Sequence, residues 1–325
     1  MTAENNLIEV TIWYRGVVEG RLARTISNSL ADAARSEGKF TQAFDNYVDL
    51  PDRVNVPCRS YVRVSSSPIA EPYIYENHNP SVVVTTDAAF VKGCDVLKGV
   101  TPEAVLIVNT CRSSANILEL AQTMENIGRV KTIATVDAGN GWQPRAPYGA
   151  GEGAADTTIA SGTAGPLLGA IVRATGVVGL ESLKLPRLDV GALERGYATV
   201  ELSENPLYRP SQDAPTPAHA EHFKGQVSLI QPAPAPNGRQ SAFVSGNFRV
   251  LRPVVDQQAC NLCRMCWLTC PDGCIEIHAD GSPEKVSIDL DYCKGCGICW
   301  NICPIKCVDA RDELDFPAGM VRIAY

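Results

Sequence analysis

Ten of the thirteen cysteines lie between Cys260 and Cys307, in a segment that contains one pattern twice. Both copies read C-x2-C-x2-C-x3-C-P, and the stretches CNLCRMCWLTCPDGCIEI and CKGCGICWNICPIKCVDA align without gaps. In an intracellular chain, thiols grouped in this way are more often metal ligands or buried thiols than disulfides. This internal repeat constrains the fold of the chain more than any other feature of the sequence.

The spacing within each run is typical of iron–sulfur ligation. Three thiolates separated by two residues can hold three irons of one cubane, while the fourth cysteine points toward the other cluster. We therefore predict two [4Fe-4S] clusters with crossed ligands, and because each run is complete, neither should be a three-iron form. Cluster 1 takes Cys260, Cys263, Cys266 and Cys303, and cluster 2 takes Cys293, Cys296, Cys299 and Cys270. Two zinc sites or a disulfide knot are the alternatives, but tetrahedral zinc commonly uses separate C-x2-C pairs.

Two further pairs of residues recur at matching positions in the repeat. Cys274 and Cys307 are interpreted as small buried residues that pack against the clusters, with extra ligation or redox chemistry as the alternative. Trp267 and Trp300 are interpreted as core and cluster cover rather than electron relays. The buried-thiol interpretation also extends to the three isolated cysteines, Cys58, Cys94 and Cys111.

Residues 1–202 alternate strand-like and helix-like patterns, which predicts an α/β domain with a mostly parallel sheet. Continuous β-branched runs suit strands buried on both faces, and such runs occupy 81–86 and 104–109. Further strands are expected at 7–13, 40–44, 60–64 and 132–136. Helices are expected at 22–35, 113–127, 163–175 and 180–183. Ser113 or Ser114 is the expected N-cap of the 113–127 helix. Gly38 is expected to end the 22–35 helix, and Gly128 the 113–127 helix.

Three regions follow from these patterns: an α/β domain at 1–202, a proline-rich linker at 203–245, and a small α+β two-cluster ferredoxin domain at 246–325. Proline removes backbone donors and favours extended chain, so the linker should run over the surface. His219 and His222 lie in this linker, where no metal site is expected because a flexible segment does not preorganise ligands.

Two loops are expected as well. Residues 146–166 are rich in Gly, Ala and Thr and read as a long loop. In the C-terminal domain, Asp280 and Gly281 are turn residues between the strands of a hairpin, 275–278 and 286–288.

Composition excludes several classes of partner. The net charge is −7 without a block of like charges, which argues against nucleic acid. No run of 18 or more apolar residues occurs, so no membrane span is expected. The N-terminal stretch MTAENNLIEV lacks the pattern of a secretory signal, and we expect a cytoplasmic protein.

The C-terminal segment, from SGNFRVLRPVVDQQAC to NICPIKCVDA, closely resembles the delta subunit of 2-oxoacid:ferredoxin oxidoreductases. The N-terminal domain resembles the gamma subunit of the same enzymes. The matching stretches are EGKFTQAF, PCRSYVRVSSSPI and LGAIVRATGVVGLESLK, in that order. The chain is thus identified as a member of this family in which a gamma and a delta subunit are fused.

The resemblance implies a function in a larger enzyme. The family decarboxylates 2-oxoacids with thiamine diphosphate and passes two electrons through [4Fe-4S] clusters to ferredoxin. It implies that thiamine diphosphate, Mg²⁺ and a further [4Fe-4S] cluster reside in alpha and beta subunits, assembled as a dimer of heterotrimers, with soluble ferredoxin as the acceptor. This chain contains no G-D-G…N signature for thiamine pyrophosphate, so no catalytic residue is assigned to it.

One stretch departs from the family pattern. Gamma subunits usually carry a glycine-rich H-G-R-G-G-Q-G turn after the first strand, and this chain has YRGVVEG at 14–20. A phosphate-bearing ligand needs close backbone approach and positive charge, whereas the valines and Glu19 oppose both. Arg15 and Arg21 are interpreted as solvated. The stretch AFDNYVDLPDRVNVP (43–57) also lacks the glycines of the family's second loop.

The altered turn bears on the substrate. In coenzyme A-dependent members the gamma domain helps to hold coenzyme A. One member, oxalate oxidoreductase, oxidises its substrate to carbon dioxide without coenzyme A and also has a fused gamma–delta chain. Oxalate is therefore the expected substrate, with pyruvate, 2-oxoglutarate, 2-oxoisovalerate or an aryl pyruvate plus coenzyme A as the alternative.

Two other classes of function compete with this interpretation. A non-catalytic iron–sulfur carrier would not need a 200-residue α/β domain. An independent nucleotide-binding enzyme is disfavoured because Gly16-x3-Gly20 is not G-x-G-x-x-G, and the glycines at 149, 151 and 153 do not follow a clear strand.

Overall fold

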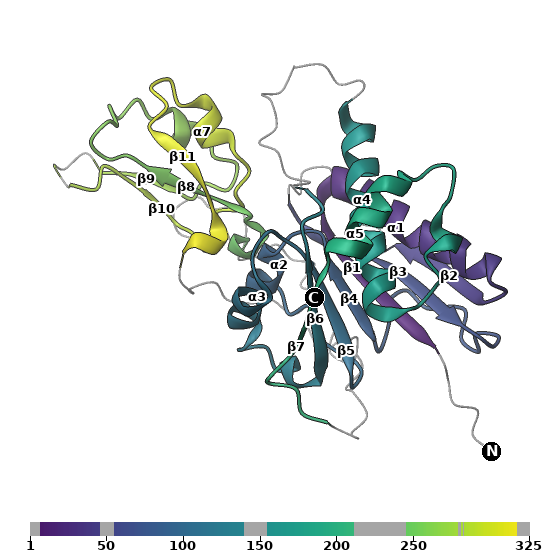
Figure 1. Cartoon of the computed structure of the whole chain (residues 1–325). Coiled ribbons are helices and arrows are strands. Elements are labelled where there is room, and N and C mark those ends of the chain that lie inside the picture. The colour runs from purple at the N-terminus through teal and green to yellow at the C-terminus, as the bar shows by residue number, and fades with distance from the viewer. Residues whose placement is uncertain are drawn as a thin grey trace.

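The computed structural model describes residues 7–45, 55–139, 155–210, 245–278, 281 and 283–316. Figure 1 shows an α/β domain and a smaller C-terminal module beside it. The proline-rich segment 211–244, with His219 and His222, lies outside the described residues, as do Asp280, the glycines at 149–153 and part of the 43–57 stretch.

A seven-stranded sheet with the order β2-β3-β1-β4-β5-β6-β7 forms the α/β domain. Its strands are β1 (Ile8–Arg15), β2 (Phe40–Asp45), β3 (Pro57–Ser65), β4 (Val82–Thr85), β5 (Ala104–Asn109), β6 (Val130–Val136) and β7 (Glu201–Glu204). β1, β4, β5 and β6 pair in parallel, while β3 is antiparallel to β1 and β2, and β7 is antiparallel to β6. Five strands therefore point the same way, which confirms the mostly parallel sheet.

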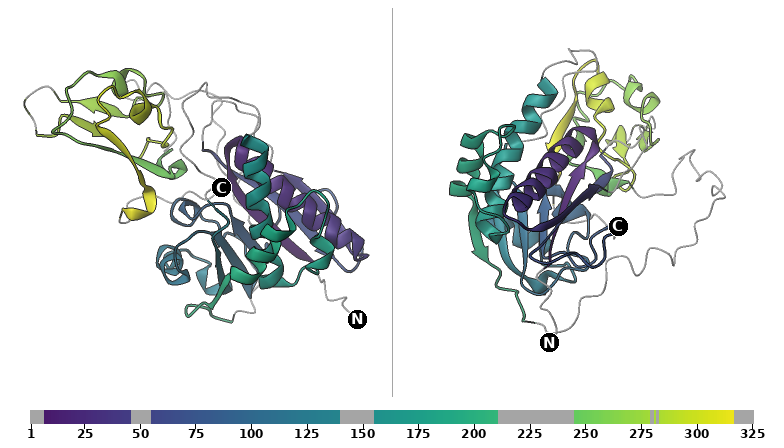
Figure 2. Two further views of the ribbon diagram at one scale, coloured as in Figure 1. Left: turned by 45° about the horizontal axis from the view of Figure 1, so that its top comes forward. Right: turned by 90° about the vertical axis from the view of Figure 1, so that its right-hand side faces the viewer.

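Helices cover both faces of this sheet (Figures 1 and 2). On one face lie α1 (Gly16–Ser36), α4 (Ala155–Thr175) and α5 (Val190–Thr199), and on the other lie α2 (Ala89–Gly93) and α3 (Ser114–Ala121). Residues of the central strands feed two separate cores: Val10 and Ile12 pack with α1 and α4, whereas Trp13 and Val83 pack with α2 and α3. Each apolar strand is thus covered on both sides, as its composition predicted.

Helix ends agree with the sequence in part. Gly38 has φ +78° just after α1, and the Ser113 hydroxyl accepts a hydrogen bond from Asn116 N at the start of α3. However, α3 ends at Ala121, and Gly128 lies in a 3-10 turn at 127–129 instead of ending the helix. Residues 181–183 form a 3-10 turn as well.

Two helices begin earlier than predicted. α1 begins at Gly16 instead of residue 22, because a carboxylate from its own first turn accepts a hydrogen bond at its start, as described below. α4 begins at Ala155 instead of residue 163, so the end of the predicted 146–166 loop is helical, and 146–154 lie outside the described residues. In α4, Ala, Thr and Ser dominate the extra turns, and these residues lack the wide apolar spacing by which a helix is recognised.

The C-terminal module contains two antiparallel strand pairs and two short helices. β8 (Leu251–Val255) pairs with β11 (Val308–Asp312), and β9 (Ile275–Ile277) pairs with β10 (Val286–Ile288). The second pair confirms the predicted hairpin strands. α6 (Met265–Leu268) and α7 (Ile298–Ile302) each begin inside a cysteine run. No described helix is long and apolar enough to cross a membrane.

Candidate metal centres

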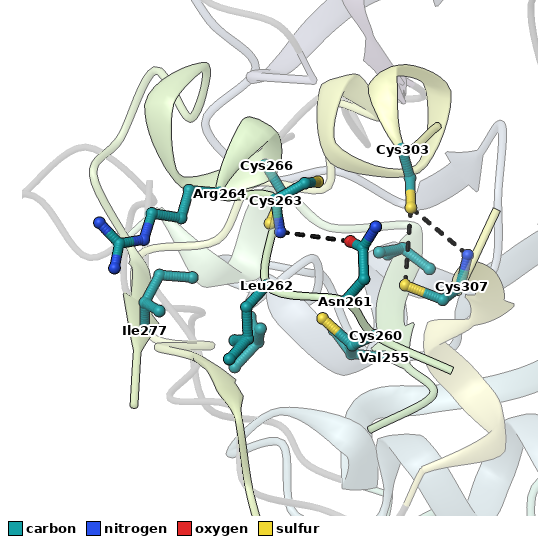
Figure 3. Close-up of a pocket in the computed structure, with 12 residues that line it drawn as sticks. Val255, Cys260, Asn261, Leu262, Cys263, Arg264, Cys266, Ile277, Cys303 and Cys307 are labelled. Atoms are coloured by element: carbon teal, nitrogen blue, oxygen red, sulfur yellow. Dashed lines mark hydrogen bonds between the residues drawn. The ribbon is translucent and has the colours of Figure 1, made fainter. Parts of the chain in front are cut away.

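The module contains a pocket where the first cysteine run meets the end of the second (Figure 3). About 360 Å³ of its space is free of protein atoms, part of it open to solvent. The cysteines that line it are Cys260, Cys263, Cys266, Cys303 and Cys307. The first four are the residues predicted to bind cluster 1, and the structure brings them together although Cys303 belongs to the other run. Val255, Leu262 and Ile277 supply apolar walls.

A second pocket of about 340 Å³ mirrors the first. Its cysteines are Cys270, Cys274, Cys293, Cys296 and Cys299. It therefore unites the four residues predicted for cluster 2 and again takes one cysteine, Cys270, from the opposite run. Soft thiolates with apolar walls form a donor set that suits iron–sulfur clusters. Among the described residues, no group of three or more His, Cys, Asp or Glu side chains is arranged to hold a single metal ion.

The same left-handed backbone conformations recur in both runs and shape the cysteine turns. In the second run they fall on Gly295 and Gly297, with φ of +67° and +88°. In the first run the equivalent residues are Leu262 and Arg264, with φ of +57° and +63°. Such angles cost free energy in residues with a Cβ atom, and strain of this kind clusters at functional sites. The repeat therefore preserves the backbone turn even where it has replaced glycine.

The two supernumerary cysteines lie beside predicted ligands. Cys274 Sγ is 3.5 Å from Cys270 Sγ, and Cys307 Sγ is 3.5 Å from Cys303 Sγ. The hydrogen bond with Cys274 lowers the pKa of the Cys270 thiol to about 6. Burial, with the hydrogen bond to Cys303, raises the pKa of Cys307 to about 12. In both pairs the pKa of the predicted ligand is lowered and the pKa of the supernumerary cysteine is raised.

Burial agrees with most interpretations of the remaining cysteines and tryptophans. Cys58, Cys94, Cys274 and Cys307 are buried, but Cys111 is exposed, so the buried-thiol interpretation is wrong for that residue. Cys111 follows β5 and lies just before α3, outside both cores. Trp300 packs against the group formed by Cys303, Cys307 and Val308. Trp267 is 51% exposed, so it is not a core residue.

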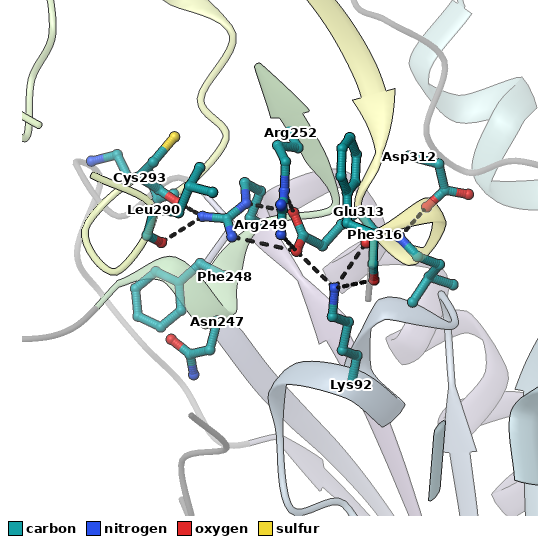
Figure 4. A network of polar contacts seen from close by, with 12 residues as sticks. Lys92, Asn247, Phe248, Arg249, Arg252, Leu290, Cys293, Asp312, Glu313 and Phe316 are labelled. Atoms are coloured by element: carbon teal, nitrogen blue, oxygen red, sulfur yellow. Dashed lines mark hydrogen bonds and ion pairs between the residues drawn. The ribbon is translucent and has the colours of Figure 1, made fainter. Parts of the chain in front are cut away.

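A buried ion network joins the module to the α/β domain (Figure 4). The carboxylate of Glu313, with a fully buried side chain, accepts hydrogen bonds from Arg249 at 2.6 Å and Arg252 at 2.5 Å. Lys92 Nζ of α2 lies 2.9 Å from the same carboxylate. Burial alone would raise the pKa of Glu313, but the hydrogen bonds from the two arginines outweigh it and lower the pKa to about 2. Sequence reasoning missed this network, because its members are distant in the chain.

The stretch expected to be an eroded ligand turn is the first turn of α1. Glu19 is buried; its carboxylate accepts hydrogen bonds from Arg15 N and from the Thr86 hydroxyl, both at 2.7 Å. Burial, together with the neighbouring charge of Asp87, raises the pKa of Glu19 to about 7. An internal carboxylate therefore lies at a helix N-terminus, the place where other α/β proteins bind phosphate.

Arg15 is buried, so its interpretation as solvated is wrong, whereas Arg21 is exposed. The Nε atom of Arg15 lies 3.1 Å from Asp87 Oδ2, and the Arg15 guanidinium lies 4.0 Å from the centre of the Phe90 ring. Arg15 Nη1 also donates to the carbonyl of Phe248, at 3.2 Å, just before β8. β1 and β4 are parallel neighbours whose following helices lie on opposite faces, which is where open α/β sheets bind ligands. Here the chain's own segment at 247–248 contacts that edge.

The fold defines a class of chain: a mostly parallel α/β domain joined to a module with two cysteine-lined pockets. Residues 18–185, about half of the chain, match the family model described as pyruvate ferredoxin/flavodoxin oxidoreductase. The chain belongs to the pyruvate ferredoxin/flavodoxin oxidoreductase family.

Relatives in this family resemble the α/β domain. The common gamma subunit of the pyruvate/ketoisovalerate oxidoreductases of Pyrococcus abyssi is 32% identical over 197 residues, covering 58% of this chain and 90% of the relative. The pyruvate synthase subunit PorC of Thermotoga maritima is 30% identical over 199 residues, covering 57% of this chain and 92% of the relative. A crystal structure of the pyruvate oxidoreductase subunit PORC from Thermotoga maritima is 26% identical, with a TM-score of 0.43, and covers 61% of this chain and 99% of its own.

Proposed function

We propose that this chain is a fused gamma–delta subunit of a 2-oxoacid:ferredoxin oxidoreductase that conducts electrons out of the active site. One observation carries the proposal: a domain of this family shares a chain with two pockets, each lined by the four cysteines of a crossed [4Fe-4S] ligand set. When bound, such clusters supply one-electron carriers. The residues of this chain would hold them in a two-cluster ferredoxin domain at 246–325. The linker expected at 203–245 would connect it to the α/β domain expected at 1–202, whose last strand, β7, reaches Glu204.

The proposed assembly contains alpha and beta subunits that provide thiamine diphosphate, Mg²⁺ and a further [4Fe-4S] cluster, arranged as a dimer of heterotrimers. Soluble ferredoxin is the proposed acceptor. The proposal is supported by the names of the relatives, which are single subunits of pyruvate/ketoisovalerate oxidoreductases and of pyruvate synthase. A lone electron carrier is disfavoured because a whole family domain precedes the module.

Two substrate classes remain as candidates. Pyruvate or a related 2-oxoacid with coenzyme A is favoured by the relatives, which are named after pyruvate and ketoisovalerate. Oxalate without coenzyme A is favoured by one feature of this chain: the buried Glu19 carboxylate at the start of α1. Its carboxyl group already occupies the backbone N–H of Arg15 at the start of this helix, which a phosphate-bearing ligand would need.

An assay of the assembled complex separates these candidates. Reduction of ferredoxin or a viologen dye is measured with pyruvate, 2-oxoisovalerate or oxalate, with and without coenzyme A. We expect 2-oxoacid-dependent reduction of ferredoxin that disappears when this chain is omitted from the complex. Strict dependence on coenzyme A would exclude the oxalate candidate, and turnover of oxalate without it would exclude the pyruvate candidate. Absence of reduction with every substrate would contradict the proposed function itself.

A further inference from the structure

The segment leading into the second cysteine run is tied to its surroundings at every residue. The carbonyl oxygens of residues 290–294 each accept a hydrogen bond. Arg249 donates to those of Leu290 and Cys293. Gly246 donates to that of Asp291, Ser245 to that of Tyr292 and Asn55 to that of Lys294. Asn55 belongs to the α/β domain, and its Nδ2 lies 3.2 Å from Lys294 O. In the first run, the carbonyl of Cys260 accepts from Lys285 of the module itself. The second run therefore lies at the junction with the α/β domain.

Arg249 is the residue that connects this segment to the ion network. Its side chain is 2% exposed, and its Nη1 donates to Cys293 O at 2.6 Å and to Leu290 O at 2.7 Å. On the other side its Nε donates to Glu313, which also holds Lys92 of the α/β domain. One planar guanidinium thus links the Glu313 carboxylate, which pairs with Lys92 across the domain junction, to the backbone of a predicted cluster ligand.

The turn after Cys293 packs directly on the same residue. A Cβ atom at Gly295 would lie 2.9 Å from Arg249 Cγ and 2.6 Å from Leu251 O. Glycine is therefore needed here for space as well as for its φ of +67°. A change in the position of Arg249 would be transmitted to the turn that carries Cys293 and Cys296.

The charge at the junction favours reduction of a cluster in the second pocket. Lys92, Arg249 and Arg252 carry three positive charges against the single carboxylate of Glu313, and Lys92, Arg249 and Glu313 are buried. Reduction adds negative charge to a cluster, and its potential depends on nearby charge, hydrogen bonds and solvent exposure. Arg249 is the member of this network that reaches a ligand residue.

We propose that Arg249 is a positioning residue that holds the Cys293 turn at the domain junction and raises the reduction potential of the cluster in the second pocket, but not in the first. The proposal rests on the proposed function, since it requires both clusters. The two clusters then have different environments. The reduction potential of the cluster in the second pocket depends on docking of the module to the α/β domain, and that of the cluster in the first pocket does not.

The test is a redox titration, monitored by electron paramagnetic resonance, of the complex containing wild-type chain, Arg249→Gln, Arg249→Lys or Arg252→Gln. In Arg249→Gln we expect one midpoint potential to fall by at least the 59 mV that corresponds to a tenfold smaller equilibrium constant for a one-electron couple. The signal that moves should be the one that a Cys270→Ser variant lacks. Arg249→Lys should give a smaller shift in the same direction, because it retains the charge but loses the fork. Arg252 pairs with Glu313 but donates to no described carbonyl of the cysteine turn, so Arg252→Gln is the matched control: it removes one junction charge, should lower the second potential much less than Arg249→Gln does, and should leave the first in place.

Equal shifts of both clusters in Arg249→Gln, an equal effect of Arg252→Gln, or no shift at all would overturn the proposal. If Arg249→Gln loses the second cluster outright, the potentials of Arg249→Lys are compared with those of the wild-type chain and of Arg252→Gln instead. A wild-type chain without iron would instead contradict the proposed function.

Discussion

Replacing Cys303 with serine should remove about half of the iron from the chain and abolish reduction of ferredoxin. Cys303 lies in the pocket of the first run although its sequence position is in the second, so the cluster lost should be the one bound by Cys260, Cys263 and Cys266. A serine oxygen is a poor substitute for a soft thiolate ligand. Iron content and the paramagnetic signal of the reduced complex measure this loss.

Cys307→Ser is the matched control for Cys303→Ser. Its sulfur lies 3.5 Å from that of Cys303 in the same pocket and is also buried, yet it is not a predicted ligand. This variant should retain all of its iron. The crossed assignment is wrong if Cys307→Ser loses as much iron as Cys303→Ser, or if Cys303→Ser removes the cluster that depends on Cys270.

Replacing Glu313 with glutamine should destabilise the chain by about 3–5 kcal/mol, because it leaves the cations of Lys92, Arg249 and Arg252 without their common anion in a buried site. Since Lys92 belongs to the α/β domain, the module should also separate from that domain more readily. Denaturant unfolding measures the first effect, and limited proteolysis between the two units measures the second.

Asp315→Asn provides the comparison for Glu313→Gln. Asp315 pairs with Arg112 at 2.7 Å across the same junction, but its side chain is 51% exposed. An exposed pair contributes about 0–1 kcal/mol, so this variant should be nearly neutral. A loss in Glu313→Gln no larger than the loss in Asp315→Asn would show that the buried network does not hold the junction.

The lowered pKa of Glu313 makes its contribution to the free energy of unfolding depend on pH. Its folded-state value of about 2 lies below its ordinary value of 4.5, so its contribution to stability is present above about pH 4.5 and is lost as the pH falls toward 2. Glu313→Gln should remove this part of the acid dependence of the free energy of unfolding. An unchanged slope between pH 4.5 and 2 would contradict the assignment.

Central strands of the sheet could be predicted where a continuous apolar run is long enough to be buried on both faces, whereas β7, with the sequence ELSE, has no such run and was not predicted. The runs at 81–86 and 104–109 became β4 and β5 with little change in their bounds. The cysteine pockets also follow from the sequence, since exact spacing in a repeat fixes which residues can meet. Even the left-handed angles of Leu262 and Arg264 carry a sequence signal, because their equivalents are Gly295 and Gly297.

The junction could not be predicted in this way. Lys92 and Glu313 are 221 residues apart, and neither belongs to a motif or a periodic pattern. Arg15 and Glu19 were assigned to a turn between the strand expected at 7–13 and the helix expected at 22–35, yet β1 and α1 run directly into each other. Their burial results from tertiary contacts with Asp87, Thr86 and Phe248, which local sequence patterns do not encode.

The proposed function requires this chain to hold two [4Fe-4S] clusters in crossed cysteine sites. The most direct measurement is iron, zinc and acid-labile sulfide in the chain purified anaerobically. About eight iron atoms and eight sulfide ions per chain are expected, with no stoichiometric zinc. Two zinc ions per chain without sulfide would contradict the claim, because zinc sites formed by thiolates contain no inorganic sulfide.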